Sequence, residues 1–223
     1  MDHAHPLRGL FAPGMAATLE VLIPSGVALT GREVHRMTRQ PVSLGAVQKA
    51  LETLTEMGLV TIQPAGRAYL YSYNREHVMA EPLVALTQAG SAIEGVLRER
   101  LGRLDPAPRA AWLFGSAARG DTTRGSDIDV AVVRPGPERD GAAVRDAPAN
   151  GETAEHDAWS QALTDLTSEV LTRSGNPCEI LEMTESELTS AVERGDPIID
   201  ELRRDARPLI GERPRALLGG GAR

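Results

Sequence analysis

The sequence of 223 residues has one cysteine, Cys178, and its aromatic content is only 3%. A single cysteine excludes an intrachain disulfide and fits a reducing compartment, so a cytoplasmic location is expected. No apolar run approaches the roughly 20 residues of a membrane span, and the N-terminus lacks the basic-then-apolar pattern of a secretory signal, so no membrane partner is expected. With so few aromatics, the core must be built mainly from Leu, Val, Ile and Ala.

Lysine is almost absent: the chain contains one lysine, Lys49, and 23 arginines. The formal net charge is −7, and it is unevenly distributed: residues 1–80 carry +1 and residues 81–223 carry −8. Basic charge is the main signature of nucleic-acid binding. Any DNA contact in the near-neutral N-terminal part must therefore come from local clusters. The length allows one large domain or two small ones.

The N-terminal third shows the order helix, helix, turn, helix, hairpin. Thr30 and Glu33 have the spacing of a capping box, and Ser43 is a typical helix N-cap. Apolar residues recur at helical spacing in the helical segments, and the two following apolar runs are separated by a Gly-containing turn. The predicted helices cover residues 14–23, 31–37 and 44–57, and the predicted strands cover residues 59–63 and 68–73.

This segment resembles winged helix-turn-helix regulators of the ArsR/MarR type over residues 14–78. The motifs are Ala50-Leu51-Glu52-Thr53-Leu54, Met57-Gly58-Leu59-Val60, Gly66-Arg67 and Tyr69-Leu70-Tyr71. The resemblance implies that the third helix enters the major groove of double-stranded DNA and that the hairpin touches the backbone. A solvated helix face or a dimerisation module is the alternative. The DNA contacts that it implies are Arg39, Ser43, Gln48, Lys49 and Arg67.

Residues 74–104 carry a further helical pattern, in which Pro82 predicts a kink or the start of a second helix. In regulators of this kind such a segment often forms the seam of a homodimer. A plain intrachain spacer is the alternative.

The second half of the chain holds two apolar runs with chemically suggestive ends. Residues 110–114 lead into Gly115-Ser116, and Asp127 and Asp129 open a run that continues to Val133. Because side chains alternate along a strand, both aspartates share one face, with Cα atoms about 6.5–7 Å apart. Paired carboxylates suit Mg²⁺, and the N–H groups of a Gly-Ser turn suit phosphate. The pattern predicts metal-assisted nucleotidyl transfer.

The block from Phe114 to Gly120, with Ser126-Asp127-Ile128-Asp129, resembles the DNA polymerase β-type nucleotidyltransferase superfamily, especially its minimal members, over residues 105–210. The resemblance implies transfer of a nucleoside monophosphate from ATP or another nucleoside triphosphate to a hydroxyl. Two Mg²⁺ ions would be held by Asp127, Asp129 and a third carboxylate. Glu179 is the first candidate for the third carboxylate, and Glu182, of opposite strand parity, is the second. The implied nucleotide contacts are Gly115, Ser116, Arg119, Arg124 and Ser126.

The remaining pattern predicts a long insertion over residues 134–153, which is either an active-site lid or a loop without function. It also predicts helices over 154–174, 184–194 and 197–209 and a strand over 178–183. The sequence thus predicts an α+β protein with an α/β nucleotidyltransferase domain built on a small mixed sheet. The predicted domains are a winged helix-turn-helix domain over 1–78, a helical linker over 79–104, the nucleotidyltransferase domain over 105–210 and a flexible tail over 211–223.

Two alternative functions remain open at this stage. One is a transcriptional regulator whose second domain senses nucleotide or acts as a scaffold. The other is a component of a toxin–antitoxin pair. The acceptor hydroxyl could belong to an antibiotic, a protein or an RNA, because no motif in the chain distinguishes these.

Overall fold

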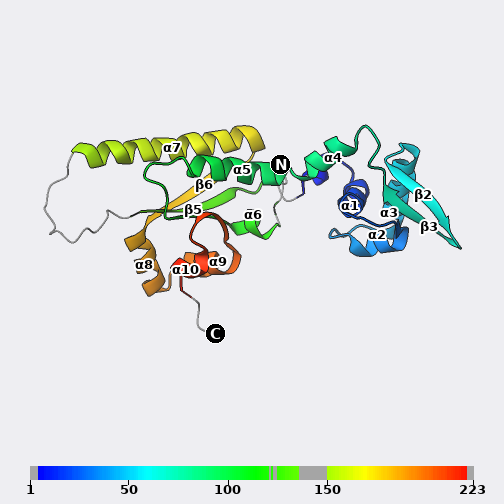
Figure 1. Ribbon diagram of the computed structural model, residues 1–223. Helices are drawn as coiled ribbons and strands as arrows, with labels where there is room; N and C mark the ends of the chain where they lie inside the picture. Colours follow the sequence, from blue (N-terminus) through cyan, green and yellow to red (C-terminus); the bar gives the residue numbers. More distant parts are fainter. Residues whose placement is uncertain (1–4, 121, 123–124, 136–149, 220–223) are drawn as a thin grey trace. The chain divides into compact units, whose positions relative to one another are not determined.

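The computed structural model describes residues 5–120, 122, 125–135 and 150–219, and it describes the side chains of the last range from Asp157 onward (Figure 1). Most of the predicted insertion over 134–153 therefore lies outside the described residues, and so does Arg124. The chain divides into two compact units between Gly90 and Ser91. This division falls inside the range predicted as a linker.

The first unit packs its helices around a Leu- and Val-rich core and carries a small antiparallel sheet with the strand order β1-β3-β2. Leu19, Leu51 and Leu54 are buried in that core. The elements are η1 (Pro6–Gly9), α1 (Pro13–Leu22), β1 (Leu29–Thr30), α2 (Gly31–Met37), α3 (Leu44–Glu56), β2 (Val60–Ala65), β3 (Ala68–Tyr73) and α4 (Ala80–Thr87).

The helix starts in this unit follow the predicted caps. The Thr30 hydroxyl accepts a hydrogen bond from the Glu33 N–H, the Glu33 carboxylate accepts one from the Thr30 N–H, and Ser43 Oγ accepts one from the Ala46 N–H. Pro82 lies in the first turn of α4, where its missing N–H costs little, and the helical pattern breaks later, at Gln88.

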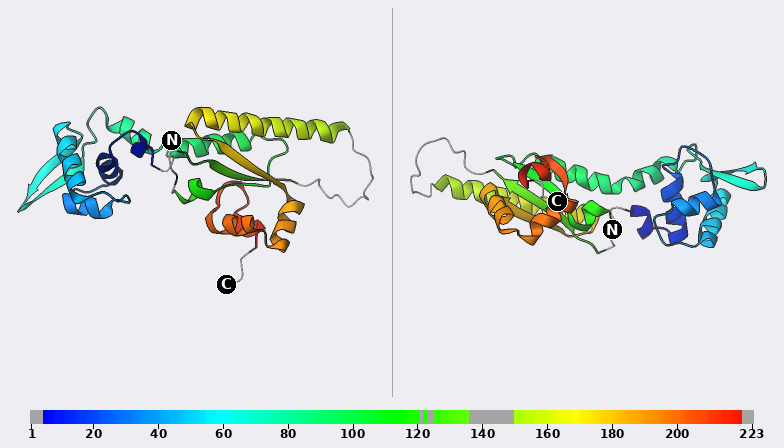
Figure 2. Two further views of the ribbon diagram at one scale, coloured as in Figure 1. Left: turned by 180° about the vertical axis from the view of Figure 1, so that it is seen from behind. Right: turned by 90° about the horizontal axis from the view of Figure 1, so that it is seen from below.

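The second unit is a four-stranded mixed sheet with the order β6-β5-β4-β7, in which β5 and β6 are parallel and the other neighbours are antiparallel. Helices α5 and α7 cover one face, and α8, α9 and α10 cover the other (Figures 1 and 2). The elements are α5 (Ala89–Leu101), β4 (Ala110–Phe114), α6 (Gly115–Arg119), β5 (Ile128–Arg134), α7 (Asn150–Ser174), β6 (Cys178–Thr184), α8 (Glu185–Arg194), α9 (Pro197–Asp205), β7 (Arg207–Gly211) and α10 (Pro214–Leu217).

Alternation along β5 decides which face carries the chemistry. Val130 and Val132 pack in the core beneath α5 and α7, whereas Ala131 and Val133 pack in the core beneath α8, α9 and α10. Both faces are covered, which explains why the central strands are continuous apolar runs. Asp129 is in phase with Ala131 and Val133, so its side chain lies on the face of α9.

The C-terminal part of the chain differs from the prediction. The helix predicted over 197–209 ends at Asp205, and residues 207–211 form β7, which pairs with β4. Pro208 would interrupt a continuing helix but is tolerated on an edge strand. The tail after Gly211 was predicted to be flexible, yet Leu218 is fully buried and Trp112 Nε1 donates to the Glu212 carbonyl at 2.7 Å. Helix α7 also begins at Asn150, earlier than predicted.

Candidate active site

The register of β5 and β6 places two of the predicted carboxylates side by side. Asp129 is paired with Glu179 across the parallel strands, so both side chains emerge on the same face, about 4.8 Å apart at the backbone. Glu182 has the opposite parity and pairs with Val132, which packs beneath α7. Glu182 lies 3.8 Å from Arg134. The structure therefore brings Glu179, and not Glu182, to the Asp129 face.

Gly115 is the residue that the Asp129 carboxylate requires at the end of β4. Its φ is +65°, and a Cβ built on it would overlap Asp129 Oδ2 and lie 3.2 Å from Asp129 Cγ. A side chain at this position would therefore meet both backbone strain and a steric clash. The sequence had predicted this glycine for its close approach to phosphate, and the contact with Asp129 supplies a second reason.

The charges around Asp129 repel one another. Its carboxyl pKa is raised above the usual range, first because burial disfavours the charged form, and then because Glu179, Asp127 and Glu201 add negative charge. Arg119 opposes the rise. Glu201, on α9, is a carboxylate that sequence analysis did not consider. In the sequence Glu201 lies one helical turn before Asp205. Charged residues at this spacing are common on surface helices, so the pattern does not single out Glu201.

Arg119, predicted to contact phosphate, is held by α9. Its Nη1 lies 2.8 Å from Asp205 Oδ2, and Asp205 also accepts two hydrogen bonds from Arg204, each at 3.0 Å. The Asp205 side chain is only 5% exposed. These two arginines hold the pKa of the Asp205 carboxyl below its usual range, the hydrogen bond from Arg204 being the larger cause. The Arg119 cation is thus anchored beside the carboxylates.

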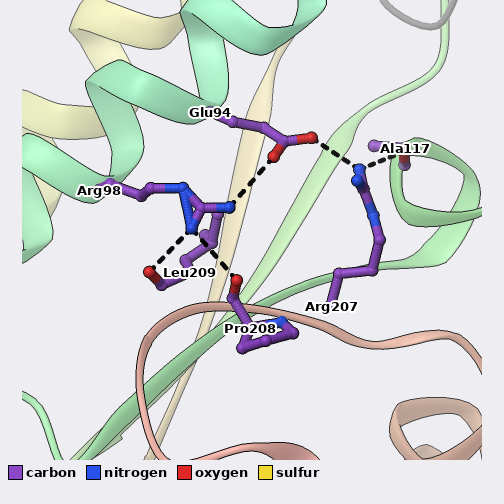
Figure 3. A network of polar contacts seen from close by, with 6 residues as sticks. All are labelled: Glu94, Arg98, Ala117, Arg207, Pro208 and Leu209. Atoms are coloured by element: carbon purple, nitrogen blue, oxygen red, sulfur yellow. Dashed lines mark hydrogen bonds and ion pairs between the residues drawn. The ribbon is translucent and has the colours of Figure 1, made fainter.

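Helix α6 is also linked to α5 and β7 by a polar network (Figure 3). Arg207 Nη2 donates to Glu94 at 2.7 Å and to the Ala117 carbonyl at 3.4 Å. Arg98 donates to Glu94 and to the carbonyls of Pro208 and Leu209. The Gly115-Ser116 turn therefore starts a short helix that is held from two neighbouring elements.

Of the remaining predicted positions, Ser116 follows Gly115 in α6 and Ser126 directly precedes Asp127. Ser116 is the second residue of α6, whose first turn has no side-chain cap. The Ser126 carbonyl accepts a hydrogen bond from Asn176 Nδ2 at 2.7 Å, directly before Asp127. Asn176 is a buried residue that sequence analysis did not consider.

The carboxylates around Asp129 are oxygen donors, which is the type of ligand that a hard cation binds. Within residues 5–120, 122, 125–135 and 150–219, no three His, Cys, Asp or Glu side chains converge with the geometry of a metal site. The carboxylates of Asp129 and Glu179 still provide neighbouring oxygen ligands on one face of the sheet. Oxygen ligands of this kind are those that Mg²⁺ prefers. The neighbouring Cys178 packs in the core beneath α7, on the face opposite to Asp129, and burial raises its thiol pKa to about 12.

In the first unit, four of the residues predicted to contact DNA have exposed side chains, and the fifth, Ser43, caps a helix. Gln48 and Lys49 lie on the exposed side of α3, and Arg67 is exposed in the turn that joins β2 to β3. Arg39 is exposed in the segment between α2 and α3. The Ser43 hydroxyl caps α3, because it accepts a hydrogen bond from the Ala46 N–H.

Comparison with known proteins gives one family. Residues 95–194 match the family model described as "Nucleotidyltransferase domain". No curated protein matches the chain. No helix within the described ranges has the length and apolar character needed to cross a membrane.

Two solved structures are similar to parts of the chain. One is titled "Crystal structure of the toxin-antitoxin with AMP-PNP", with 19% identity, a TM-score of 0.35, and coverage of 56% of this chain and 80% of that one. The other is that of TrmBL2, described as an archaeal chromatin protein with a novel mode of DNA binding. It shows 16% identity, a TM-score of 0.28, and coverage of 85% and 71%.

Proposed function

We propose that the second unit is a metal-dependent nucleotidyltransferase of the polymerase β type, acting over residues 105–210. The observation that carries the proposal is the register of Asp129 with Glu179, which sets two carboxylates on one face beside the Gly115-Ser116 turn. The match of residues 95–194 to the nucleotidyltransferase domain model supports it.

Asp127, Asp129 and Glu179 would hold the metal ions, and Mg²⁺ bound there would supply charge neutralisation for the triphosphate and activation of the acceptor hydroxyl. The nucleoside triphosphate, ATP in our proposal, would lie against the Gly115-Ser116 turn, whose uncapped N–H groups suit phosphate oxygens. Arg119, anchored by Asp205, would contribute a charge-assisted contact. Ser126 would position the start of β5.

The test is transfer of labelled nucleotide to a panel of acceptors, together with thermal shifts by nucleoside triphosphates with and without Mg²⁺. We expect Asp127→Ala with Asp129→Ala to abolish transfer and Glu179→Gln to reduce it by at least about 100-fold, since one or more metal ligands are lost. Glu182→Gln is the matched control on the same strand, and it should retain near-normal transfer. Full activity in the double variant would refute the assignment.

A second candidate function concerns the first unit. We propose that residues 1–78 form a winged helix-turn-helix domain that binds double-stranded DNA, because α3 presents Gln48 and Lys49 to solvent and the β2–β3 turn presents Arg67. The predicted linker over residues 79–104 is divided between the two units, because α4 packs in the first core and α5 packs in the second. A homodimer is part of this proposal. A gel shift should show binding that weakens steeply with salt. A nucleotide-sensing regulator or a toxin–antitoxin component would retain Mg²⁺-dependent nucleotide binding without transfer to small acceptors.

A further inference from the structure

The segment between α7 and β6 holds the start of β5 on both sides of Asp127. Asn176 Nδ2 donates to the Ser126 carbonyl at 2.7 Å, and the Ile128 N–H donates to the Pro177 carbonyl at 2.9 Å. Ser126 and Ile128 are the two neighbours of Asp127. Consecutive residues of one loop therefore fix the backbone before and after this aspartate.

The same loop leads directly into the strand that carries Glu179. Cys178 pairs with Ile128 and Glu179 pairs with Asp129, so the contacts of Asn176 and Pro177 continue without a break into the parallel ladder. The loop therefore links the backbone around Asp127 to the strand that carries Glu179. The relative position of the carboxylates thus depends on residues that belong to neither strand.

Asn176 is built into the structure as a buried amide. It is 1% exposed, and its backbone N–H donates to Ser174 Oγ at 3.0 Å, while Ser174 Oγ donates to the Val170 carbonyl at 2.6 Å. A buried amide without a hydrogen bond costs free energy, so the side chain is committed to its partners. A carboxylate at this position could not donate to the Ser126 carbonyl at neutral pH and would repel it.

We infer that Asn176 is a positioning residue that aligns Asp127 with Asp129 and Glu179 for metal binding. The inference rests on the proposed function of the second unit. Asn176 acts through the Ser126 carbonyl and touches no reacting group in this interpretation. Residues that orient metal ligands in this way typically change metal affinity 10–100-fold when they are replaced.

The first measurement is amide hydrogen exchange of the full-length protein without metal or nucleotide. Asn176→Ala should accelerate exchange at Asp127, Ile128 and Asp129, because the start of β5 loses its tether. Thr172→Ala is the control, since it removes an exposed hydroxyl bonded to the Ser168 carbonyl at the end of α7 and leaves the hydrogen bonds of Asn176 to Ser126 and Ser174 in place. Unchanged exchange in Asn176→Ala, or equal acceleration in both variants, would overturn the inference.

The second measurement is the affinity for Mn²⁺ in the absence of nucleotide, determined by calorimetry. We expect Asn176→Ala and Asn176→Asp to weaken binding by about 10–100-fold and Thr172→Ala to leave it within about twofold. Similar affinity in wild type and Asn176→Ala would also overturn the inference. Absence of Mn²⁺ binding in the wild type would refute the proposed metal site, and the exchange result would then show separately whether Asn176 tethers Asp127.

Discussion

At the scale of single residues, the negative charge of Asp129 destabilises the folded protein. Its pKa is raised by burial and by Glu179, Asp127 and Glu201, so above that pKa its ionised form opposes folding. The contribution of this group to stability falls as the pH rises from the unfolded pKa, 3.8, through the folded one. Loss of the charge should therefore stabilise the protein at neutral pH.

The corresponding prediction is that Asp129→Asn raises the Tm at pH 7 while it abolishes transfer. Because the site is partly open to solvent, screening limits the gain to about 1 kcal/mol, or roughly 2–4 °C for a chain of this size. Thermal unfolding without metal is the measurement. Saturating Mg²⁺ should raise the Tm of the wild type and leave that of the variant almost unchanged. A lower Tm in Asp129→Asn would contradict this electrostatic account.

Sequence patterns predicted the residue types of the site and the side of the strand on which they lie. Strand parity alone favoured Glu179 over Glu182, and the parallel pairing with β5 places Glu179 beside Asp129. The contribution of Glu201 was not predictable, because it depends on how α9 packs across the sheet. Asn176 was missed for a similar reason, since its hydrogen bond joins positions 50 apart in the sequence.

At the scale of elements, local caps were the most reliable predictors. Thr184 accepts from the Glu187 N–H at 3.2 Å, and the Glu187 carboxylate accepts from the Thr184 N–H at 2.7 Å, so the helix predicted over 184–194 begins with a capping box. These hydrogen bonds hold the pKa of the Glu187 carboxyl below its usual value. In contrast, residues 207–209 of β7 were assigned to a helix, because the pairing of β7 with β4 is a tertiary contact.

We predict that Thr184→Ala lowers the free energy of unfolding by about 1 kcal/mol, since the first turn of α8 loses its cap. The effect should be present at pH 7 and shrink as the pH falls through the lowered pKa of Glu187, because protonation removes the carboxylate that completes the box. Chemical denaturation at both pH values is the measurement. Thr189→Ala, which removes an exposed hydroxyl bonded to the Glu185 carbonyl within the same helix, is the control and should change stability little.

At the scale of the whole molecule, the two units have separate cores, since among the described residues the buried cluster around Leu19, Leu51 and Leu54 contains none of the second unit. We therefore expect Lys49→Ala with Arg67→Ala to weaken DNA binding and reduce its salt dependence without changing nucleotidyl transfer. Gel shifts over a range of salt concentrations and transfer assays on the same preparations are the measurements. Equal DNA affinity in wild type and variant would reject the proposed contact surface.

The late position of β7 has a consequence for biosynthesis. Trp112 in β4 bonds to Glu212, 100 positions further along the chain, and β7 completes the sheet at the edge of β4. On a ribosome, β4 emerges long before the strand that will cover its flank. Until then its backbone N–H and C=O groups present an unpaired edge, which is the kind of surface that recruits other chains. We therefore expect nascent chains that are stalled before Arg207 to bind chaperones more strongly than chains that include β7.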